Sequence, residues 1–395
     1  MSERLVGMPR AWGRNPTATS RFRQRTKACW VFTILTALFA VLGVLDILTM
    51  VVGPDGPYAL VGIVAWLAWL VLAAALFGLV DVYRAVPWSI NLAMLAWGAF
   101  PATLIAGWLE AAALPIFGPS YTVAVTAGLV EEAVKLLGII LLAASMPALF
   151  RRPMGALICA MMAGLGFGFH ENVVHAYAPF AELGAHVGAA EKIGTSLQTV
   201  LIRGFSSGAW AYLAFAGVAS LGVVYFLSRT DLTPGRRLGV PTLLFLVAAL
   251  LHFGTDMPLA ENTIGVLASN TLQIALLSWL IVHAVRAERN WLPVAAAAAG
   301  PVVRPDEVGM LRTRRTRHQA RTAISDRAAR ARTKTRQWAQ IGYLRAIDEA
   351  APGTQSERLA SYVALLRNPV RSGRIPGQRR HSPSDERRPS AEPFG

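Results

Sequence analysis

Charged residues are scarce in this sequence of 395 residues: they make up 15% of it, whereas about 25% is usual in a soluble globular domain. Hydrophobic residues make up 54%. This composition excludes a water-soluble enzyme, and the long apolar runs are typical of membrane-spanning helices. Cysteine is almost absent, since Cys29 and Cys159 are the only two and both lie in apolar stretches. The sequence therefore excludes a disulfide framework and a CxxC metal site.

Acidic residues are few at both ends of the chain. Residues 1–28 hold seven Lys or Arg against one acid, residues 289–395 hold 21 against nine, and residues 29–288 hold 10 against 13. We interpret the ends as basic flanks that orient a membrane protein and contact anionic lipid. Basic ends also occur in nucleic-acid-binding proteins, but the apolar block between them leads us to expect no nucleic acid partner.

Eight apolar segments are long enough, at about 20 residues each, to cross a bilayer as helices. They are 29–52, 59–80, 87–107, 122–149, 154–178, 205–227, 239–258 and 264–285. Lys and Arg accumulate in every second connecting loop, as they do on the cytoplasmic side of membrane proteins. We therefore predict an all-α fold, a polytopic membrane helix bundle of about eight transmembrane helices with both termini cytoplasmic.

The distribution of charge and apolar residues predicts four regions. Residues 1–28 form a basic cytoplasmic leader and residues 29–288 form the membrane domain. Residues 289–367 form a basic, partly helical cytoplasmic tail, in which 311–349 has the composition of one strongly basic helix. Residues 368–395 are rich in Pro, Ser and Arg, which predicts disorder.

Charged side chains inside membrane helices cost about 2.5–3.5 kcal/mol each and therefore indicate function. Together with the histidines, the candidates are Asp46, Glu131, Glu132, Lys135, His170, Glu171, His175, Arg203, His252 and Asp256. Asp46 has no evident partner, and we interpret it as an interfacial or interhelical hydrogen-bonding group.

Glu131, Glu132 and Lys135 lie together in the fourth predicted span. Helical spacing brings Lys135 within reach of either carboxylate, so one carboxylate is left over. A spare carboxylate in a low-dielectric site can act as a general base. The sequence does not decide which glutamate this is, and a buried ion pair that holds helices together is the alternative interpretation.

Two further spans carry histidine and carboxylate side chains four residues apart. Glu171 shares a helix face with His175, and His252 shares one with Asp256. This spacing suits a metal ion or an activated water, although a structural hydrogen bond is the alternative. At about 1.5 Å per residue, the acids and His252 lie at similar depth, near the membrane midplane or in its outer half. We therefore predict an active site shared by three helices.

The chain resembles the PrsW family of intramembrane proteases, relatives of the CAAX-type prenyl-protein proteases. The family motifs EExxK, FxxxE and HxxxD read here Glu131-Glu132-Ala-Val-Lys135, Phe167-Gly-Phe-His-Glu171 followed by Asn172, and His252-Phe-Gly-Thr-Asp256. The resemblance covers residues 120–260 and implies a multi-pass protease of a bacterial plasma membrane. It also implies a single-span, membrane-anchored protein substrate, such as an anti-sigma-factor-like regulator, cut near the outer leaflet.

The resemblance further implies roles for individual residues. Glu131 and Glu132 activate water while Lys135 holds one of them. Asn172 orients Glu171 or donates a hydrogen bond to an oxyanion. The residues that would bind a metal, zinc by analogy, or position the water are Glu171, His252 and Asp256.

One segment departs from the family pattern. Members carry a further histidine between an Arg and a Gly in the span after FxxxE, and the matching stretch here, 203–217, has Arg203 and Gly217 but no histidine. Either His170 or His175 substitutes for it from the neighbouring helix, or the site is weakened. Arg203, His170 and His175 are therefore auxiliary candidates for the site.

Two other function classes remain open. A catalytically inactive membrane scaffold of the same fold would bind single-span partners or lipid, and the missing histidine favours it. A proton- or ion-coupled transporter would also carry intramembrane acids and histidines. Transporters often consist of repeated halves, and this sequence shows no internal repeat.

Overall fold

The computed structural model describes residues 26–53, 55–118, 126–183, 188–204, 208–255 and 263–348, with Ala364, and all regular elements among them are helices. The first half contains α2 (Lys27–Val52), α3 (Gly56–Val80), α4 (Trp88–Trp97), the π-helix η2 (Gly98–Ala102), α5 (Thr103–Phe117), the π-helix η3 (Thr126–Glu131) and α7 (Glu132–Ser145). The second half contains the 3₁₀-helix η4 (Pro147–Phe150), α8 (Pro153–Leu183), α9 (Ala189–Ile202), α10 (Gly208–Ser228), α11 (Pro234–Thr255), α12 (Thr263–Ala298), the 3₁₀-helix η7 (Gly300–Val302), α13 (Pro305–Leu311), α14 (Arg314–Thr322) and α15 (Arg327–Asp348). The predicted all-α fold class is confirmed.

Seven helical segments of the described residues are long and apolar enough to cross a membrane, which confirms a multi-pass membrane bundle. They are Lys27–Val52, Gly56–Val80, Trp88–Phe117, Pro153–Tyr177, Trp210–Ser228, Pro234–Thr255 and Ile264–Ala298. The predicted span over 122–149 is not among them. Its described part is divided between η3 and α7, and α7 has 14 residues, with Glu132 and Lys135 in its first turn. Residues 119–125 lie outside the described part of the chain.

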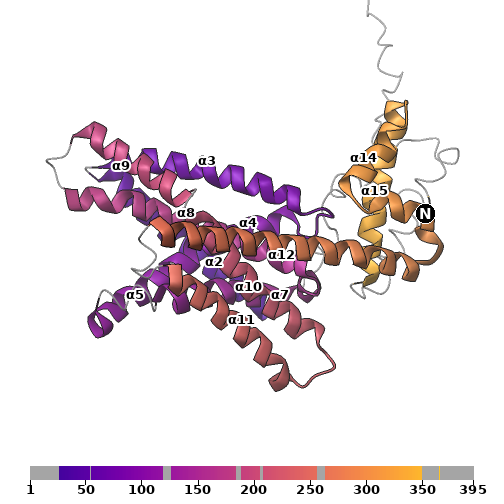
Figure 1. Cartoon of the computed structure of the whole chain (residues 1–395), viewed down its shortest axis with the longest axis horizontal. Coiled ribbons are helices and arrows are strands. Elements are labelled where there is room, and N and C mark those ends of the chain that lie inside the picture. The colour runs from indigo at the N-terminus through magenta and orange to yellow at the C-terminus, as the bar shows by residue number, and fades with distance from the viewer. Residues whose placement is uncertain are drawn as a thin grey trace, which may run out of the picture.

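Helix α8 forms the centre of the bundle, and the other helices pack around it (Figure 1). In its membrane-spanning part 89% of the residues are buried, against 17% in α2 and α11 and 22% in α3 and α12. The outer helices direct large apolar side chains outward, including Ile34, Val41, Val64 and Leu250. An apolar surface of this extent is stable in lipid rather than in water.

Glycines at residues 164–168 allow close packing around α8. A Cβ atom on Gly166 would overlap the backbone carbonyl oxygen of Leu95 in α4, and one on Gly164 would lie 2.5 Å from the carbonyl oxygen of Tyr212 in α10. Small residues of this kind let membrane helices approach backbone to backbone. As a result, α8 holds α4 on one face and α10 on another.

The region after the bundle folds into a small helical unit. Helix α12 continues well past the predicted end at 285, and α14 and α15 lie beyond its far end, away from the bundle (Figure 1). The expectation of one helix over 311–349 needs correction, because Thr313 caps α14 and the Asp326 carboxylate accepts the Ala329 N–H at 2.6 Å at the start of α15. We call the helices α13, α14 and α15 the C-terminal unit.

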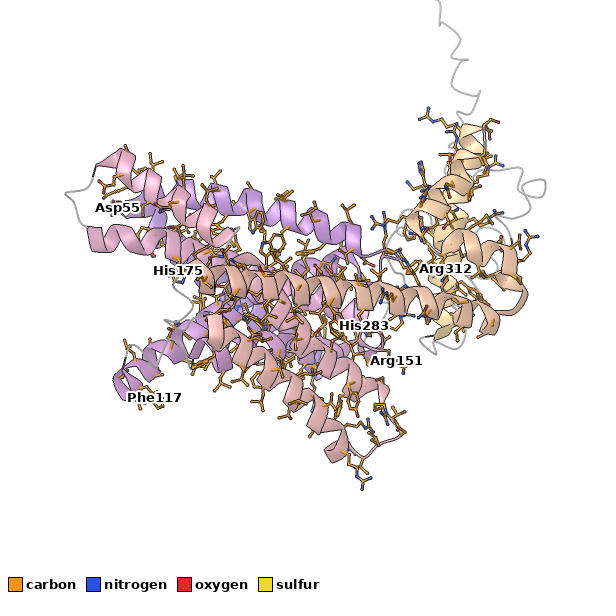
Figure 2. All side chains as sticks on the ribbon, in the orientation of Figure 1. Asp55, Phe117, Arg151, His175, His283 and Arg312 are labelled. Atoms are coloured by element: carbon orange, nitrogen blue, oxygen red, sulfur yellow. The ribbon has the colours of Figure 1, made fainter. Side chains whose placement is uncertain are left out.

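The two ends of the bundle differ in their charged residues. Figure 2 places Asp55 and Phe117 at one end, and Arg151 and Arg312 at the other. This separation agrees with the alternation of basic loops along the sequence. The cytoplasmic location of both termini remains a prediction, and the leader 1–25 and the tail 368–395 lie outside the described residues.

Candidate active site

Glu132, Lys135 and His252 form a buried, charged contact between α7 and α11. The Lys135 Nζ atom lies 2.5 Å from Oε1 of Glu132, and the His252 Nδ1 atom lies 2.9 Å from the same oxygen. Both Glu132 and Lys135 are fully buried. An ion that is buried without partners costs several kcal/mol. The contacts with Lys135 and His252 offset this cost for the Glu132 carboxylate.

The sequence brings α7 and α11 together through a glycine. A Cβ atom on Gly128 in η3 would lie 2.7 Å from the carbonyl oxygen of Ala249 in α11. Any larger residue at this position would therefore push the two helices apart. One turn later on each helix, Glu132 and His252 face each other. A π-helical turn such as η3 is frequent at functional sites because it shifts the side chains that follow it.

Glu131 lies at the more open edge of the same cluster. Its Oε2 atom is 3.7 Å from Lys135 Nζ and 3.7 Å from His252 Nε2. The Glu131 side chain is 13% exposed, whereas that of Glu132 is 0% exposed. Of the two glutamates, Lys135 therefore holds Glu132 more closely, and Glu131 is the one that a water molecule can reach.

A second cluster lies where α8 meets the end of α9. Arg203 donates from Nη2 to Oε1 of Glu171 at 2.9 Å and from Nε to Oδ1 of Asn172 at 2.5 Å. His175, one turn after Glu171, has its Nε2 atom 3.2 Å from the same Glu171 oxygen. Among the described residues, the Asn172 Nδ2 donor is buried without an acceptor. A buried donor of this kind can bind an acceptor on a ligand, a substrate or a water molecule.

Tyr212 of α10 connects the two clusters. Its hydroxyl accepts a hydrogen bond from Arg203 Nη2 at 3.0 Å, and its ring lies 5.2 Å from Lys135 Nζ. The Phe167 ring lies 4.3 Å from the same ammonium group. Cation–π contacts of this length are favourable in a desolvated site. Gly168 leaves room for the Tyr212 ring, because a Cβ atom there would lie 2.6 Å from it.

Most of the residues singled out from the sequence meet here, but some do not. His170 points to the other side of α8, where Nδ1 lies 2.5 Å from the Ala99 carbonyl oxygen and Nε2 lies 3.1 Å from Oδ2 of Asp46. Asp46 therefore has a partner that its own helix did not reveal. Asp256 lies outside the described residues. Tyr212 was missed, although it stands in the segment that lacks the expected histidine.

Among the described residues, which do not include Asp256, the side chains do not fit a metal ion. These residues contain no group of three or more His, Cys, Asp or Glu side chains that could hold one. Glu171 and His252 belong to different clusters. Arg203 already supplies a positive charge beside the Glu171 carboxylate, and Lys135 supplies one beside the Glu132 carboxylate. A dication at either carboxylate would compete with a bound ammonium or guanidinium group.

Residues 86–285 match the family described as PrsW family intramembrane metalloprotease. This range contains both clusters and Tyr212. No curated protein and no solved structure matches the chain. The family implies intramembrane protease activity, and its description implies a metal. Since the match spans more than half of the sequence, the chain belongs to the PrsW family of intramembrane metalloproteases.

Proposed function

We propose that this protein is an intramembrane endopeptidase in which Glu131 is the general base. The observation that carries the proposal is the unequal pair of adjacent carboxylates: Glu132 is sealed by Lys135 and His252, and Glu131 is accessible beside them. Two carboxylates in different surroundings can take different roles at the same pH.

The reaction needs one water molecule and one peptide bond. Glu131 accepts a proton from the water as its oxygen attacks the carbonyl carbon of the substrate. The tetrahedral intermediate then breaks at the C–N bond, and Glu131 returns the proton to the leaving amine. One water is consumed, and a carboxyl and an amino terminus are released.

The remaining residues hold this arrangement. Glu132 fixes Lys135 and His252, whose ammonium group and Nε2 atom respectively lie 3.7 Å from Glu131. The buried Asn172 Nδ2 atom is available to donate to the oxyanion, and Arg203 fixes the amide by binding Oδ1. No step passes through a metal ion.

We propose a single-span membrane protein as the substrate, an anti-sigma-factor-like regulator by analogy, in the plasma membrane of a bacterium. The substrate helix would enter between the spans, and cleavage would occur near the outer leaflet. The support for this is the buried position of Glu132 within an apolar bundle, together with the place of Arg151 and Arg312 at the end of the structure opposite Asp55 (Figure 2).

The proposal is tested by comparing membrane-protein fragments in cells that express the wild type, Glu131→Gln or Glu132→Gln. Glu131→Gln should abolish a fragment cut near the outer membrane face, since losing a general base costs about 10²–10⁴ in rate. It should lower thermal stability less than Glu132→Gln does, because Glu131 lies farther from Lys135 and is partly exposed. Glu132→Gln should also lower stability, by up to about 3–5 kcal/mol, because it removes the nearer of the two carboxylates beside the buried Lys135 and leaves only Glu131, at 3.7 Å.

The exposed Glu191→Gln variant on α9 is the control, because it removes the same charge away from the site. It should produce the wild-type fragments. The chelator 1,10-phenanthroline should not slow cleavage in isolated membranes. Identical fragments from all variants would instead favour an inactive scaffold, and full inhibition by the chelator would contradict the metal-free mechanism.

A further inference from the structure

A basic pocket lies between the end of α3 and the C-terminal unit. It has a volume of about 430 Å³ and lies beside Gly78, in the last turn of α3. Its lining includes five cationic side chains, Arg84, Arg314, Arg317, Arg321 and Lys334. No carboxylate is among the described residues that line it. Such a concentration of one sign of charge attracts an anion.

Contacts with backbone carbonyl groups and an aromatic ring orient two of these cationic side chains, Arg314 and Arg317. Arg314 Nη2 donates to the Gly78 carbonyl oxygen at 2.7 Å, and the buried Arg317 donates to the carbonyl oxygens of Leu311 and Val82, both at 2.7 Å. Trp338 packs against Arg317, with 5.3 Å from the guanidinium carbon to the ring centre. These contacts orient the guanidinium groups without neutralising them. By contrast, the buried Arg345 is paired with Glu288 at 3.0 Å.

The cationic side chains of the basic pocket affect the pKa of one another, as Arg317 shows. Burial, together with the neighbouring Arg314, Arg321 and Arg84, lowers the pKa of Arg317 to about 10. An arginine pKa normally lies above 12. The folded protein therefore carries mutual repulsion at this site, and a bound anion would relieve it.

An apolar cleft adjoins the basic pocket. It has a volume of about 290 Å³, lies between α3, α4 and α8, and shares Gly78 and Arg84 with the basic pocket. Its apolar lining includes Ala74, Phe77 and Met162. Asp81 also lines it, but the Asp81 carboxylate accepts the backbone N–H groups of its own loop, at Ala85 and Val86. The cleft lies among helices that span the membrane, and the basic pocket lies where they end.

We propose that the two adjoining cavities together bind one phospholipid with an anionic headgroup. The phosphate and headgroup occupy the basic pocket, and part of an acyl chain occupies the cleft beside Ala74 and Met162. A free phosphate or polyphosphate would use only the basic half. The two cavities share Gly78 and Arg84 in their linings, at the height where a span ends, and this adjacency favours a lipid.

The test is native mass spectrometry of the full chain in detergent, titrated with phosphatidylglycerol, phosphatidylcholine or inorganic pyrophosphate. One phosphatidylglycerol should bind tightly. Arg321→Gln with Lys334→Gln should weaken that binding about 30-fold, since each basic contact with an anionic lipid contributes roughly fivefold. Ala74→Phe, which fills the cleft, should weaken phosphatidylglycerol binding and leave pyrophosphate binding unchanged.

The matched control is Arg315→Gln with Arg327→Gln, which removes the same charge from exposed positions of α14 and α15 outside the lining. It should bind phosphatidylglycerol as the wild type does. Equal loss in the control and in the pocket variant would show a diffuse charge effect and overturn the proposal. Equal affinity of the wild type for phosphatidylcholine and phosphatidylglycerol would also overturn it. So would a result in which pyrophosphate prevents phosphatidylglycerol binding and Ala74→Phe does not weaken that binding.

Discussion

Tyr212 contacts charged residues of both clusters of the site. Its ring lies against Lys135 and His252, and its hydroxyl accepts from Arg203. It thus links the carboxylate pair on α7 with the Glu171 cluster on α8. In a site with few water molecules, hydrogen bonds to charged groups are stronger than in water.

Tyr212→Phe separates the role of the hydroxyl from that of the ring. The variant keeps the packing on Lys135, so the protein should fold and bind substrate normally. The loss of one hydrogen bond to a charged group, at about 1.5–3 kcal/mol, should lower the cleavage rate about tenfold or more through the position of Arg203. The rate and KM are measured with an identified substrate. Tyr225→Phe on the same helix is the control, and an equal loss there would contradict this role.

At the residue scale, local spacing predicts the partners but not the choice among them. The sequence places Lys135 within reach of both Glu131 and Glu132, and the structure shows it nearer to Glu132. The choice depends on His252, which binds the same Glu132 oxygen from a position 120 residues away. Likewise, Asp46 shows no partner in its own helix because its partner, His170, lies 124 residues away.

Among the elements, α8 depends on glycine more than any other helix of the site. A Cβ atom on Gly98 in η2 would overlap the backbone of Ala163 in α8. A Cβ atom on Gly166 in α8 would overlap the backbone of Leu95 in α4. The same helix carries Glu171 and Asn172 little more than one turn after Gly166. The position of the site therefore depends on this helix contact.

Gly166→Ala should force α8 away from α4. Because the added Cβ meets backbone atoms, which cannot rotate away, we expect a loss of about 1–3 kcal/mol in stability together with reduced activity. Gly107→Ala in α5 is the matched control, since nothing lies within 4 Å of the new Cβ atom. That variant should be as stable as the wild type or more so, by about 0.5–1 kcal/mol. Thermal unfolding in detergent measures both, and equal stability of the two variants would contradict the packing argument.

At the element scale, the sequence predicts the spans but not their interruptions. Apolar length identifies seven of the eight expected spans, whereas the π-helical turns η2 and η3 have no clear signal apart from Pro101 in η2. The tail is different, because its caps could have been found. Thr313 and Asp326 are residue types that often precede the first turn of a helix. They mark the starts of two helices, α14 and α15, in a basic segment whose composition predicts one helix.

For the molecule as a whole, Glu288 ties the C-terminal unit to the bundle. It is buried in α12, with one oxygen 3.2 Å from Arg152 Nε, just before α8, and the other 3.0 Å from Arg345 Nη2 in α15. The Trp291 ring packs on the Arg152 guanidinium carbon at 3.9 Å. The unit that helps to form the basic pocket is thus attached to the helix that leads to the site.

Glu288→Gln tests whether this attachment holds the two parts together. It removes the carboxylate that both Arg152 and Arg345 contact, and breaking a buried pair from one side costs about 3–5 kcal/mol. We expect a lower midpoint of thermal unfolding and faster tryptic cleavage within α13–α15. Asp231→Asn is the control, because it breaks an exposed pair with Arg229, which contributes at most about 1 kcal/mol. If Glu288→Gln resists trypsin as well as Asp231→Asn does, the C-terminal unit is held by its apolar contacts, and the charged link does not fix the position of the basic pocket.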